Sequence, residues 1–309
     1  MTETPVTVVL AAYNHRRFIR RALEAVAAQT LAPKLIVTDD ASRDGSPEVI
    51  EAEMERLGLT AQIIFHRTNR GICATFNEAL ALVETPLVAF ISADDWMAPR
   101  RVELQAERLL AEDDSTALVY GDMVTVDSDG NERGTWSVDW SPATALGLAG
   151  QVYLELLRNN FIPTPSVMLR TTCVRAVGGY DEALPFEDLD MWYRLAREFT
   201  FTFLAEPLVY YRMHADSMSA TAQRDDTTIL DAHIRILTKQ MGHSPEADEV
   251  ILPRLFDATA RRLKAGPASP ALAGPLFAYA LRYRSARAAA FAAAAGLRLP
   301  VWRLIKGTP

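Results

Sequence analysis

The chain has 309 residues, a net charge of −7, 49% hydrophobic residues and 23% charged residues, which is an ordinary composition for a globular protein. The longest nearly uncharged stretch, 288–297, is shorter than the ~20 residues of a membrane-spanning helix, and no charged-then-apolar leader opens the chain. Cys73 and Cys173 lack the spacing of a metal site or a disulfide framework, so we expect a protein of the reducing cytoplasm that does not cross a bilayer.

The first part of the chain alternates between two hydrophobic patterns. Short apolar runs rich in β-branched residues predict strands, and apolar residues spaced by three and four predict helices. Ser46 is a predicted helix N-cap, and Pro47 would occupy the first helical position. Such alternation predicts an α/β fold with a mostly parallel, Rossmann-like sheet flanked by helices. The expected order is strand 6–11, helix 16–28, strand 34–39, a helix from Ser46, strand 62–66, helix 71–83, strand 87–92 and a helix from Pro99 to about Leu110.

The pattern becomes mixed after Ala117. Turn-forming residues at 127–131 predict a hairpin. From about Thr221 the chain is predicted to be helical, with breaks near Gly266 and Gly274, each of which precedes a proline. The other expected elements are strands 118–120, 123–126, 166–169, 201–204 and 208–211 and helices 147–158 and 188–198.

The net charge hides an asymmetry between the body and the tail. Residues 254–309 hold ten basic residues and one acidic residue, a net charge of +9, so the rest of the chain carries −16 within the total of −7. A basic tail predicts an anionic partner. Apolar residues such as Trp302 among the bases favour an anionic membrane surface over nucleic acid. Arg282, Arg284 and Arg287 do not share one helical face, so a helical cap or a homo-oligomer contact is an equal alternative.

Two acidic pairs end two of the predicted strands. Asp39 and Asp40 follow one apolar run, and Asp94 and Asp95 follow another. The carboxyl ends of parallel strands lie at the edge where open α/β sheets bind ligands. Paired carboxylates there suit a divalent cation with its phosphates, which indicates an enzyme acting on a nucleotide-sugar.

Six motifs in a fixed order resemble those of the family 2 glycosyltransferases, which have the glycosyltransferase A fold. The resemblance covers roughly residues 5–220 and implies inverting transfer of a sugar from a nucleotide-sugar, with a UDP-sugar preferred. Each motif alone is weak, but six in order and at plausible spacing are specific. They are VVLAAYN at 8–14, VTDDASRDGS at 37–46, NRG at 69–71, ISADD at 91–95, VGGYDE at 177–182 and ED at 187–188.

The donor nucleotide requires a flat apolar wall and an acceptor for the imide N–H of its base. The strand end at Ala11 and Tyr13, with the carboxylate of Asp40, offers both. The resemblance assigns Asp40, with Asp39 beside it, to the uracil edge and Tyr13 to the ring. Arg70, at the start of a predicted helix, and Arg67 are both candidates for the phosphates. The alternative is that the acidic pair and the glycine after Arg70 serve only as turn and cap residues.

The second acidic pair is the predicted metal site. A Mn²⁺ or Mg²⁺ ion neutralises the charge that develops on a pyrophosphate leaving group. Ser92 stands where the family often has its first acid, so the resemblance makes Asp95 the direct ligand and turns Asp94 towards the ribose or sugar. His214 is a second candidate ligand and Arg212 a candidate partner of phosphate oxygens, although a lone histidine after a strand is as often structural.

Inverting transfer also requires a base that takes the proton from the incoming hydroxyl. Asp188, after Glu187 at the start of a predicted helix, resembles the aspartate that serves as base in the family. Asp190 is the nearest competitor, but a shift of two residues turns a helical side chain by ~200°. The helix dipole by itself also favours acidic residues at this position.

Three other classes fit the sequence less well. A phosphoacceptor receiver domain places its acidic pair after the first strand, but here the first strand leads into Ala12, Tyr13 and Asn14. A dinucleotide oxidoreductase requires Gly-x-Gly-x-x-Gly after a strand, and none follows residues 6–11. A processive polysaccharide synthase would add membrane spans and a Gln-x-x-Arg-Trp segment. A catalytically degenerate nucleotide-sugar-binding or scaffold protein of the same fold stays open as an alternative.

The sequence therefore predicts a metal-dependent, inverting glycosyltransferase. The acceptor would be a hydroxyl of a glycan or a lipid-linked molecule in polysaccharide or cell-surface glycan biosynthesis. Residues 1–220 would form the nucleotide-sugar-binding catalytic domain, and residues 221–309 a helical, basic C-terminal extension. The expected location is the cytoplasm, with peripheral attachment to the inner face of the membrane if the extension binds lipid.

Overall fold

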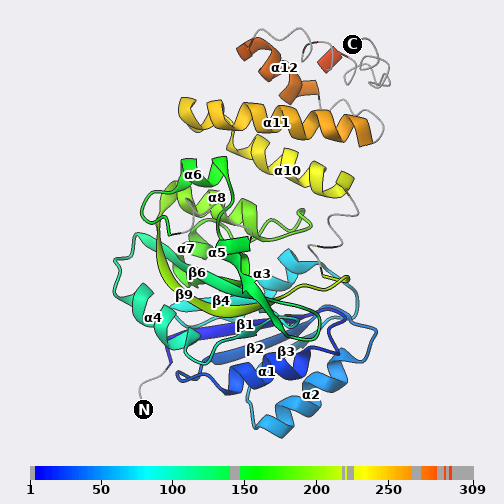
Figure 1. Ribbon diagram of the computed structural model, residues 1–309, viewed down its shortest axis with the longest axis vertical. Coiled ribbons are helices and arrows are strands. Elements are labelled where there is room, and N and C mark those ends of the chain that lie inside the picture. The colour runs from blue at the N-terminus through cyan, green and yellow to red at the C-terminus, as the bar shows by residue number, and fades with distance from the viewer. Residues whose placement is uncertain are drawn as a thin grey trace. The chain divides into compact units, whose positions relative to one another are not determined.

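The computed structural model describes residues 4–139, 147–217, 220, 226–265, 273–283, 289 and 292–293. The chain divides into two compact units, Met1–His214 and Ala215–Pro309. The first unit contains the β-sheet and every residue predicted to belong to the donor, metal or base positions (Figure 1).

The first half of the sheet unit has the predicted alternation of strands and helices. Its first helix starts at Ile19, later than expected, and the residues before it bond elsewhere: the His15 N–H donates to Ser46 and the Arg16 N–H to Asp44, in the segment after the second strand. A two-residue strand, β5, precedes the fourth helix. The elements are β1 Val6–Ala12, α1 Ile19–Ala27, β2 Lys34–Asp39, α2 Ser46–Leu57, β3 Gln62–Phe65, α3 Ile72–Leu82, β4 Leu87–Ser92, β5 Trp96–Met97 and α4 Arg101–Leu110.

The second half joins segments that the sequence divided. β6 is one strand and not two, and β9 continues through Pro207. Pro207 has no N–H to donate to the sheet, and the pairing register of β6 with β9 shifts on both sides of its partner Asp122, so the ladder continues without that hydrogen bond. Gly121 allows the close approach, since an added Cβ would lie 3.0 Å from the carbonyl oxygen of Leu204. The elements are β6 Thr116–Val126, β7 Glu132–Thr135, α5 Trp136–Asp139, α6 Tyr153–Arg158, the 3-10 helix η1 Thr164–Ser166, β8 Met168–Arg170, α7 Thr171–Ala176, α8 Asp188–Glu198 and β9 Thr200–Arg212.

The sheet is mixed, and its parallel part carries the acidic pairs. The strand order is β3-β2-β1-β4-β8-β6-β9-β5, with β7 paired to β6 outside this path. The first four strands are parallel, as predicted, whereas β8 runs antiparallel to both β4 and β6. Ala12 pairs with Asp39 and Ala11 with Ser92, so the ends of β1, β2 and β4 lie at one edge. The chain passes from β1 to β2 on one side and reaches β4 on the other, and such a switch point forms a ligand crevice.

Hydrophobic residues cover both faces of the parallel strands. Val8 and Leu10 of β1 lie in one cluster with residues of α1, α2 and α4, and α1 and α2 lie together beneath the sheet in Figure 1. On another part of β4, Phe90 contacts Phe76 of α3 and Tyr180, with ring centroids 4.5 and 5.4 Å apart. Burial of these hydrophobic side chains is the main favourable contribution to the stability of this unit. It holds the carboxyl ends of the parallel strands in place.

The second unit is helical in its described part. It contains α10 Asp226–Gln240, α11 Pro245–Ala265 and α12 Ala273–Tyr283. α12 begins where a break was expected, with Gly274 and Pro275 in its first turn, where a missing N–H costs nothing. Phe256 and Tyr279 stack with centroids 4.3 Å apart. The predicted break at Gly266, and the tail residues Arg284, Arg287 and Trp302, lie outside the described residues.

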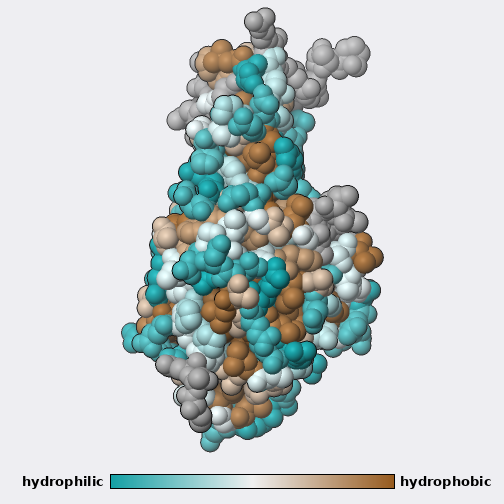
Figure 2. All heavy atoms as spheres, turned by 90° about the vertical axis from the view of Figure 1, so that its left-hand side faces the viewer, coloured by the Kyte–Doolittle hydropathy of each residue, from teal (hydrophilic) through white to brown (hydrophobic). Residues whose placement is uncertain are grey.

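Among the described residues, none of the helices combines the length and the apolar composition that a membrane span requires. On the face drawn in Figure 2, hydrophilic residues are interspersed with hydrophobic ones over both units.

Candidate active site

The loops that follow β1 and β2 are bonded to each other at the carboxyl edge of the sheet. Asn14 adopts the left-handed conformation, with φ +56°, which asparagine tolerates better than most residues. Its N–H donates to Ser42 Oγ at 2.7 Å, and its Oδ1 accepts the Arg43 N–H at 2.9 Å. The His15 N–H donates to Ser46 Oγ at 3.0 Å. These hydrogen bonds fix the backbone on either side of Asn14 and so position Tyr13 and His15 at the carboxyl edge of the sheet.

The predicted base-binding residues differ in how exposed they are. Ala11 is buried within β1, whereas the Tyr13 side chain is 47% exposed beyond the end of that strand. Asp39 is buried and accepts both the N–H of Ser42, at 2.8 Å, and its hydroxyl. Tyr13 is therefore about half exposed at the edge, while Asp39 forms hydrogen bonds within the turn after β2.

Asp40 is the centre of a second hydrogen-bonded network. Its two carboxylate oxygens accept the N–H groups of Arg70 and Gly71, both at 2.8 Å, and His66 Nδ1 lies 2.7 Å from Oδ1. On its other side, His66 Nε2 lies 3.2 Å from Glu78, which also pairs with the Arg70 guanidinium. A carboxylate has about four acceptor positions, so Asp40 retains room for one further donor. The Arg70 side chain is engaged by Glu78, and its backbone is the part held against Asp40.

Asp94 faces two histidines. Its Oδ2 lies 3.0 Å from His214 Nε2 and 3.7 Å from His15 Nε2. Its Oδ1 and His15 Nδ1 are buried, and neither has a hydrogen-bond partner within the described part of the chain. Burial acts to raise the pKa of Asp94, but the hydrogen bond from His214 and the neighbouring His15 lower it to about 2. The edge thus holds an anionic carboxylate with an unused oxygen next to two imidazoles.

Asp95 is directed into the protein instead. It is 3% exposed, and its Oδ1 accepts the Arg212 N–H at 2.8 Å. Burial in the first place, and the charge of Asp94 in the second, raise the pKa of Asp95 well above its ordinary value. The environments of the two carboxyl groups therefore push their pKa values apart, and Asp94 is the one that carries the negative charge at the edge.

The Glu187–Asp188 pair stands at the start of α8. Asp188 Oδ2 accepts the Thr164 hydroxyl at 2.8 Å, and Oδ1 accepts the Leu189 N–H at 2.6 Å, while the side chain stays partly exposed. Burial, and then the charge of Asp188, raise the pKa of Glu187 to about 8, so Glu187 is mostly protonated at neutral pH. Burial and the neighbouring charge of Asp188 therefore favour the protonated form of Glu187.

Asp190 occupies a different environment from Asp188. It is 1% exposed, and its Oδ2 accepts Nε–H of Arg194 at 2.8 Å. Arg194 also donates to the Val177 carbonyl at 2.6 Å. This ion pair ties α8 to the segment before it, and such a buried carboxylate is a structural element of the helix.

Three residues of these networks were not predicted from the sequence: His15, His66 and Thr164. His15 directly follows the VVLAAYN motif, and this adjacency is the one signal that could have drawn attention to it. His66 and Thr164 meet their partners across 26 and 24 residues of sequence, and no local pattern reports such contacts.

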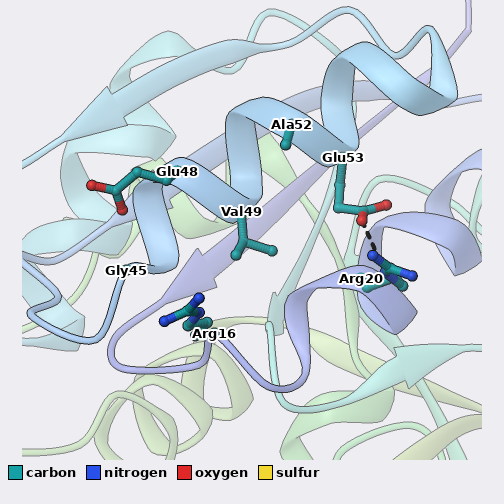
Figure 3. A pocket seen from close by; sticks show the side chains of 7 residues that line it. All are labelled: Arg16, Arg20, Gly45, Glu48, Val49, Ala52 and Glu53. Atoms are coloured by element: carbon teal, nitrogen blue, oxygen red, sulfur yellow. Dashed lines mark ion pairs between the residues drawn. The ribbon is translucent and has the colours of Figure 1, made fainter.

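A surface hollow of about 370 Å³ lies between α2 on one side and the first turn of α1 with the segment before it on the other (Figure 3). Glu53 crosses it to pair with Arg20 at 2.9 Å, shown dashed in Figure 3. None of the predicted donor, metal or base residues lines it, so we place the candidate site at the strand ends. The lining residues are Arg16, Arg20, Gly45, Glu48, Val49, Ala52 and Glu53.

A Rossmann-like sheet with acidic pairs at the carboxyl edge of its parallel strands is the architecture of the glycosyltransferase A fold. The chain belongs to glycosyl transferase family 2, whose sequence profile matches residues 7–167, more than half of its length. This match confirms the family predicted from the six motifs and the glycosyltransferase nature of the domain.

Two relatives show how far the sequence similarity extends. An uncharacterised glycosyltransferase of Rickettsia conorii is 26% identical over 220 residues, which is 70% of this chain and 35% of the relative. The present chain therefore spans about a third of the length of that relative. An uncharacterised glycosyltransferase of Nostoc sp. is 26% identical over 232 residues, covering 71% of this chain and 70% of the relative.

Solved structures share the fold at low sequence identity. The S. aureus TarS fragment 1–349 in complex with UDP-GlcNAc has a TM-score of 0.65 at 16% identity, covering 97% of this chain and 91% of that one. The mannosyltransferase PcManGT from Pyrobaculum calidifontis, in complex with GDP-Man and Mn²⁺, has a TM-score of 0.61 at 17% identity, covering 98% and 88%. These similarities confirm the predicted α/β fold class.

Proposed function

We propose that this protein is an inverting, metal-dependent glycosyltransferase that uses a nucleotide-sugar donor, with a UDP-sugar preferred. The observation that carries the proposal is the anionic Asp94, whose buried Oδ1 has no partner among the described residues while two imidazoles face its other oxygen. An unpartnered buried carboxylate oxygen at the carboxyl edge of an α/β sheet suits a cation and its phosphates. The TarS and PcManGT complexes with nucleotide-sugars support the same assignment.

The donor base would lie against the strand end after Ala11. The half-exposed Tyr13 ring offers a stacking face, and Asp40 has acceptor room for one imide N–H beside the three donors it already binds. Asp39 would hold the turn and not the base. Arg70 would contribute mainly through its backbone, which Asp40 fixes at the start of α3.

The cation would be held by Asp94 and His214, and not by Asp95 as the sequence suggested. No group of three or more His, Cys, Asp or Glu side chains among the described residues is arranged to hold a metal alone. Mg²⁺ and Mn²⁺ commonly bind through one or two protein ligands together with substrate phosphates, so a sparse protein contribution fits. When bound, the ion would neutralise the charge of the departing nucleoside diphosphate.

Asp188 would be the general base. It carries the negative charge of the Glu187–Asp188 pair, and the start of α8 and the Thr164 hydroxyl hold it in one orientation. In a single displacement, the acceptor oxygen attacks the anomeric carbon, its proton passes to Asp188, and the nucleoside diphosphate leaves from the opposite face. The product therefore has the inverted anomeric configuration.

The acceptor we propose is a glycan or lipid-linked hydroxyl, in polysaccharide or cell-surface glycan biosynthesis. Catalysis is assigned to residues 1–220, and residues 221–309 form a basic extension with a net charge of +9 beyond residue 253. Such an extension would associate peripherally with an anionic membrane surface at the inner face of the membrane. A helical cap or a contact between copies is the competing use of the same segment.

The test is a panel of UDP-, GDP- and dTDP-sugars incubated with the protein and Mn²⁺, read by release of the nucleoside diphosphate. We expect release from one donor, strongest with a UDP-sugar, and its loss in chelator. Tight nucleotide binding without any turnover, in the presence of candidate acceptors, would favour the degenerate sugar-nucleotide-binding protein. Turnover that is unchanged in excess chelator would contradict the metal dependence.

A further inference from the structure

Arg212, the last residue of β9, meets both members of the second acidic pair. Its backbone N–H donates to Asp95 Oδ1 at 2.8 Å, and its Nε donates to the carbonyl oxygen of Asp94 at 2.9 Å. Its Nη1 donates to the carbonyl oxygen of Ser128, in the turn between β6 and β7, at 2.9 Å. One buried side chain thus joins the end of β4, the end of β9 and the β6–β7 turn.

The guanidinium of Arg212 is also enclosed by aromatic rings. Its central carbon lies 4.6 Å from the centroid of Phe18 and 4.8 Å from that of Trp96. At Gly130 of the β6–β7 turn, an added Cβ would lie 3.6 Å from Nη1, so the turn closes on the guanidinium. The sequence suggested Arg212 as a partner of phosphate oxygens. Its side chain is instead occupied by these contacts and only 5% exposed, so we assign it a different role.

We propose that Arg212 is a positioning residue that sets the distance between His214 and Asp94. It fixes the backbone of Asp94 on one side and the strand end two residues before His214 on the other. The next backbone N–H, that of Met213, donates to the Val126 carbonyl at 2.9 Å, so the residue directly before His214 is also held against β6. Phe18 contacts both the Arg212 guanidinium and the His214 ring, whose centroid lies 4.9 Å from its own. The 3.0 Å approach of His214 Nε2 to Asp94 Oδ2 is the result.

This task requires arginine and not merely a positive charge. Lysine carries one ammonium group and cannot donate in two directions in a plane while stacking between two rings. Arg212→Lys should therefore keep the charge and release the geometry. The inference rests on the proposed function only for its effect on nucleotide binding.

The geometry is tested by NMR of the histidine rings in the metal-free protein. The chain has five histidines, so long-range ¹H–¹⁵N spectra of the imidazoles should resolve them. We expect Arg212→Lys to shift the ring signals of His214 and His15 and to leave those of His233 and His243, in the second unit, in place. Trp96→Leu removes one of the two rings that enclose the guanidinium and should shift the same two signals, although the described ring contacts of His15 and His214 are with Phe18 and not with Trp96.

Arg170→Lys is the matched control. Arg170 is likewise a buried arginine that donates to backbone carbonyls, those of Leu109 at 3.0 Å and Thr116 at 3.2 Å among them, but it lies in β8. It should lower the thermal midpoint to a similar degree without moving either histidine signal. Unchanged His214 and His15 signals in both test variants, or equal shifts in Arg170→Lys, would overturn the proposal.

Binding of UDP and of GDP with Mn²⁺, measured by calorimetry, gives the functional consequence. We expect Arg212→Lys to weaken the tighter of the two complexes roughly tenfold or more, the effect of one lost hydrogen bond to a charged group, and Arg170→Lys to leave it unchanged. Equal affinity in wild type and Arg212→Lys would contradict the proposal. If the wild type binds neither nucleotide, the proposed function fails, while the histidine spectra still decide the role of Arg212.

Discussion

Replacing Asp188 by asparagine should remove most of the sugar transfer and leave the fold intact. Asparagine Oδ1 can still accept the Leu189 N–H, and the Thr164 hydroxyl can rotate to accept from the new amide, so both present hydrogen bonds have a substitute. We therefore expect the free energy of unfolding to fall by less than about 1 kcal/mol. What asparagine cannot do is take a proton.

The magnitude of the catalytic loss follows from that single missing function. General base catalysis contributes roughly 10²–10⁴ in rate, which is about 2.7–5.5 kcal/mol of activation free energy at ~1.36 kcal/mol per factor of ten. Donor affinity should stay near that of the wild type, because the described hydrogen bonds of Asp188 go to Thr164 and Leu189, and neither residue is proposed to bind the nucleotide.

Asp190→Asn is the matched control, two residues away on the same helix. It breaks the ion pair with Arg194, and removing one partner of a buried pair costs about 3–5 kcal/mol; we expect the lower end because Arg194 stays 21% exposed. The thermal midpoint should fall by roughly 6–12 °C for a unit of this size, while the turnover of the folded fraction persists. Asp188→Asn should therefore lower catalysis and spare stability, whereas Asp190→Asn should lower stability and spare catalysis.

The assay measures nucleoside diphosphate release from the preferred donor, with acceptor present, beside thermal unfolding of the same samples. Product configuration is determined by NMR of the anomeric proton. Wild-type transfer by Asp188→Asn, or a product that retains the configuration of the donor, would refute the proposed mechanism.

Three further predictions concern the metal, the acid pair and the tail. Asp94→Ala should abolish Mn²⁺-dependent nucleotide binding, measured by calorimetry, whereas Asp95→Asn should mainly lower the thermal midpoint; the reverse assignment would restore Asp95 as the ligand. The raised pKa of Glu187 means that the unfolded chain releases this proton first, so its stabilising contribution is complete below pH 4.5 and is lost as the pH rises to about 8. Glu187→Gln should gain in free energy of unfolding relative to wild type across that range in denaturant titrations, and a constant difference would contradict the shift. Deleting 270–309 should spare donor hydrolysis but weaken co-sedimentation with anionic vesicles, an effect that fades with salt because screening shortens the field to ~8 Å; equal binding with and without the tail would exclude it.

The alternation of strands and helices could be predicted because it is recorded locally. Residues buried on both faces of a parallel strand form short apolar runs, and helices covering them repeat their apolar residues every three or four positions. β2 and β4 begin and end where the sequence placed them. The acidic pairs at the ends of these strands were found for the same reason, since a charged residue directly after a buried run marks the edge of the sheet.

Long-range pairing decided what the local pattern divided. β6 and β9 each look like two short strands, yet they pair along their whole length, and the register shifts near Pro207 keep the ladder continuous. Propensity at a glycine or a proline argues for a break, and only the neighbouring strand supplies the hydrogen bonds that outweigh it.

The tertiary structure also decided the different environments of two adjacent carboxylates. Asp94 and Asp95 have nearly the same local sequence, so no motif tells which of them meets the histidines and which meets the Arg212 backbone. The choice is made by β9, which returns more than a hundred residues later, places its Arg212 N–H on Asp95 and brings His214 to Asp94. Contacts at that sequence separation depend on the packing of the whole sheet, and for this reason the sequence determined where the charged groups gather while the fold alone determined what each of them contacts.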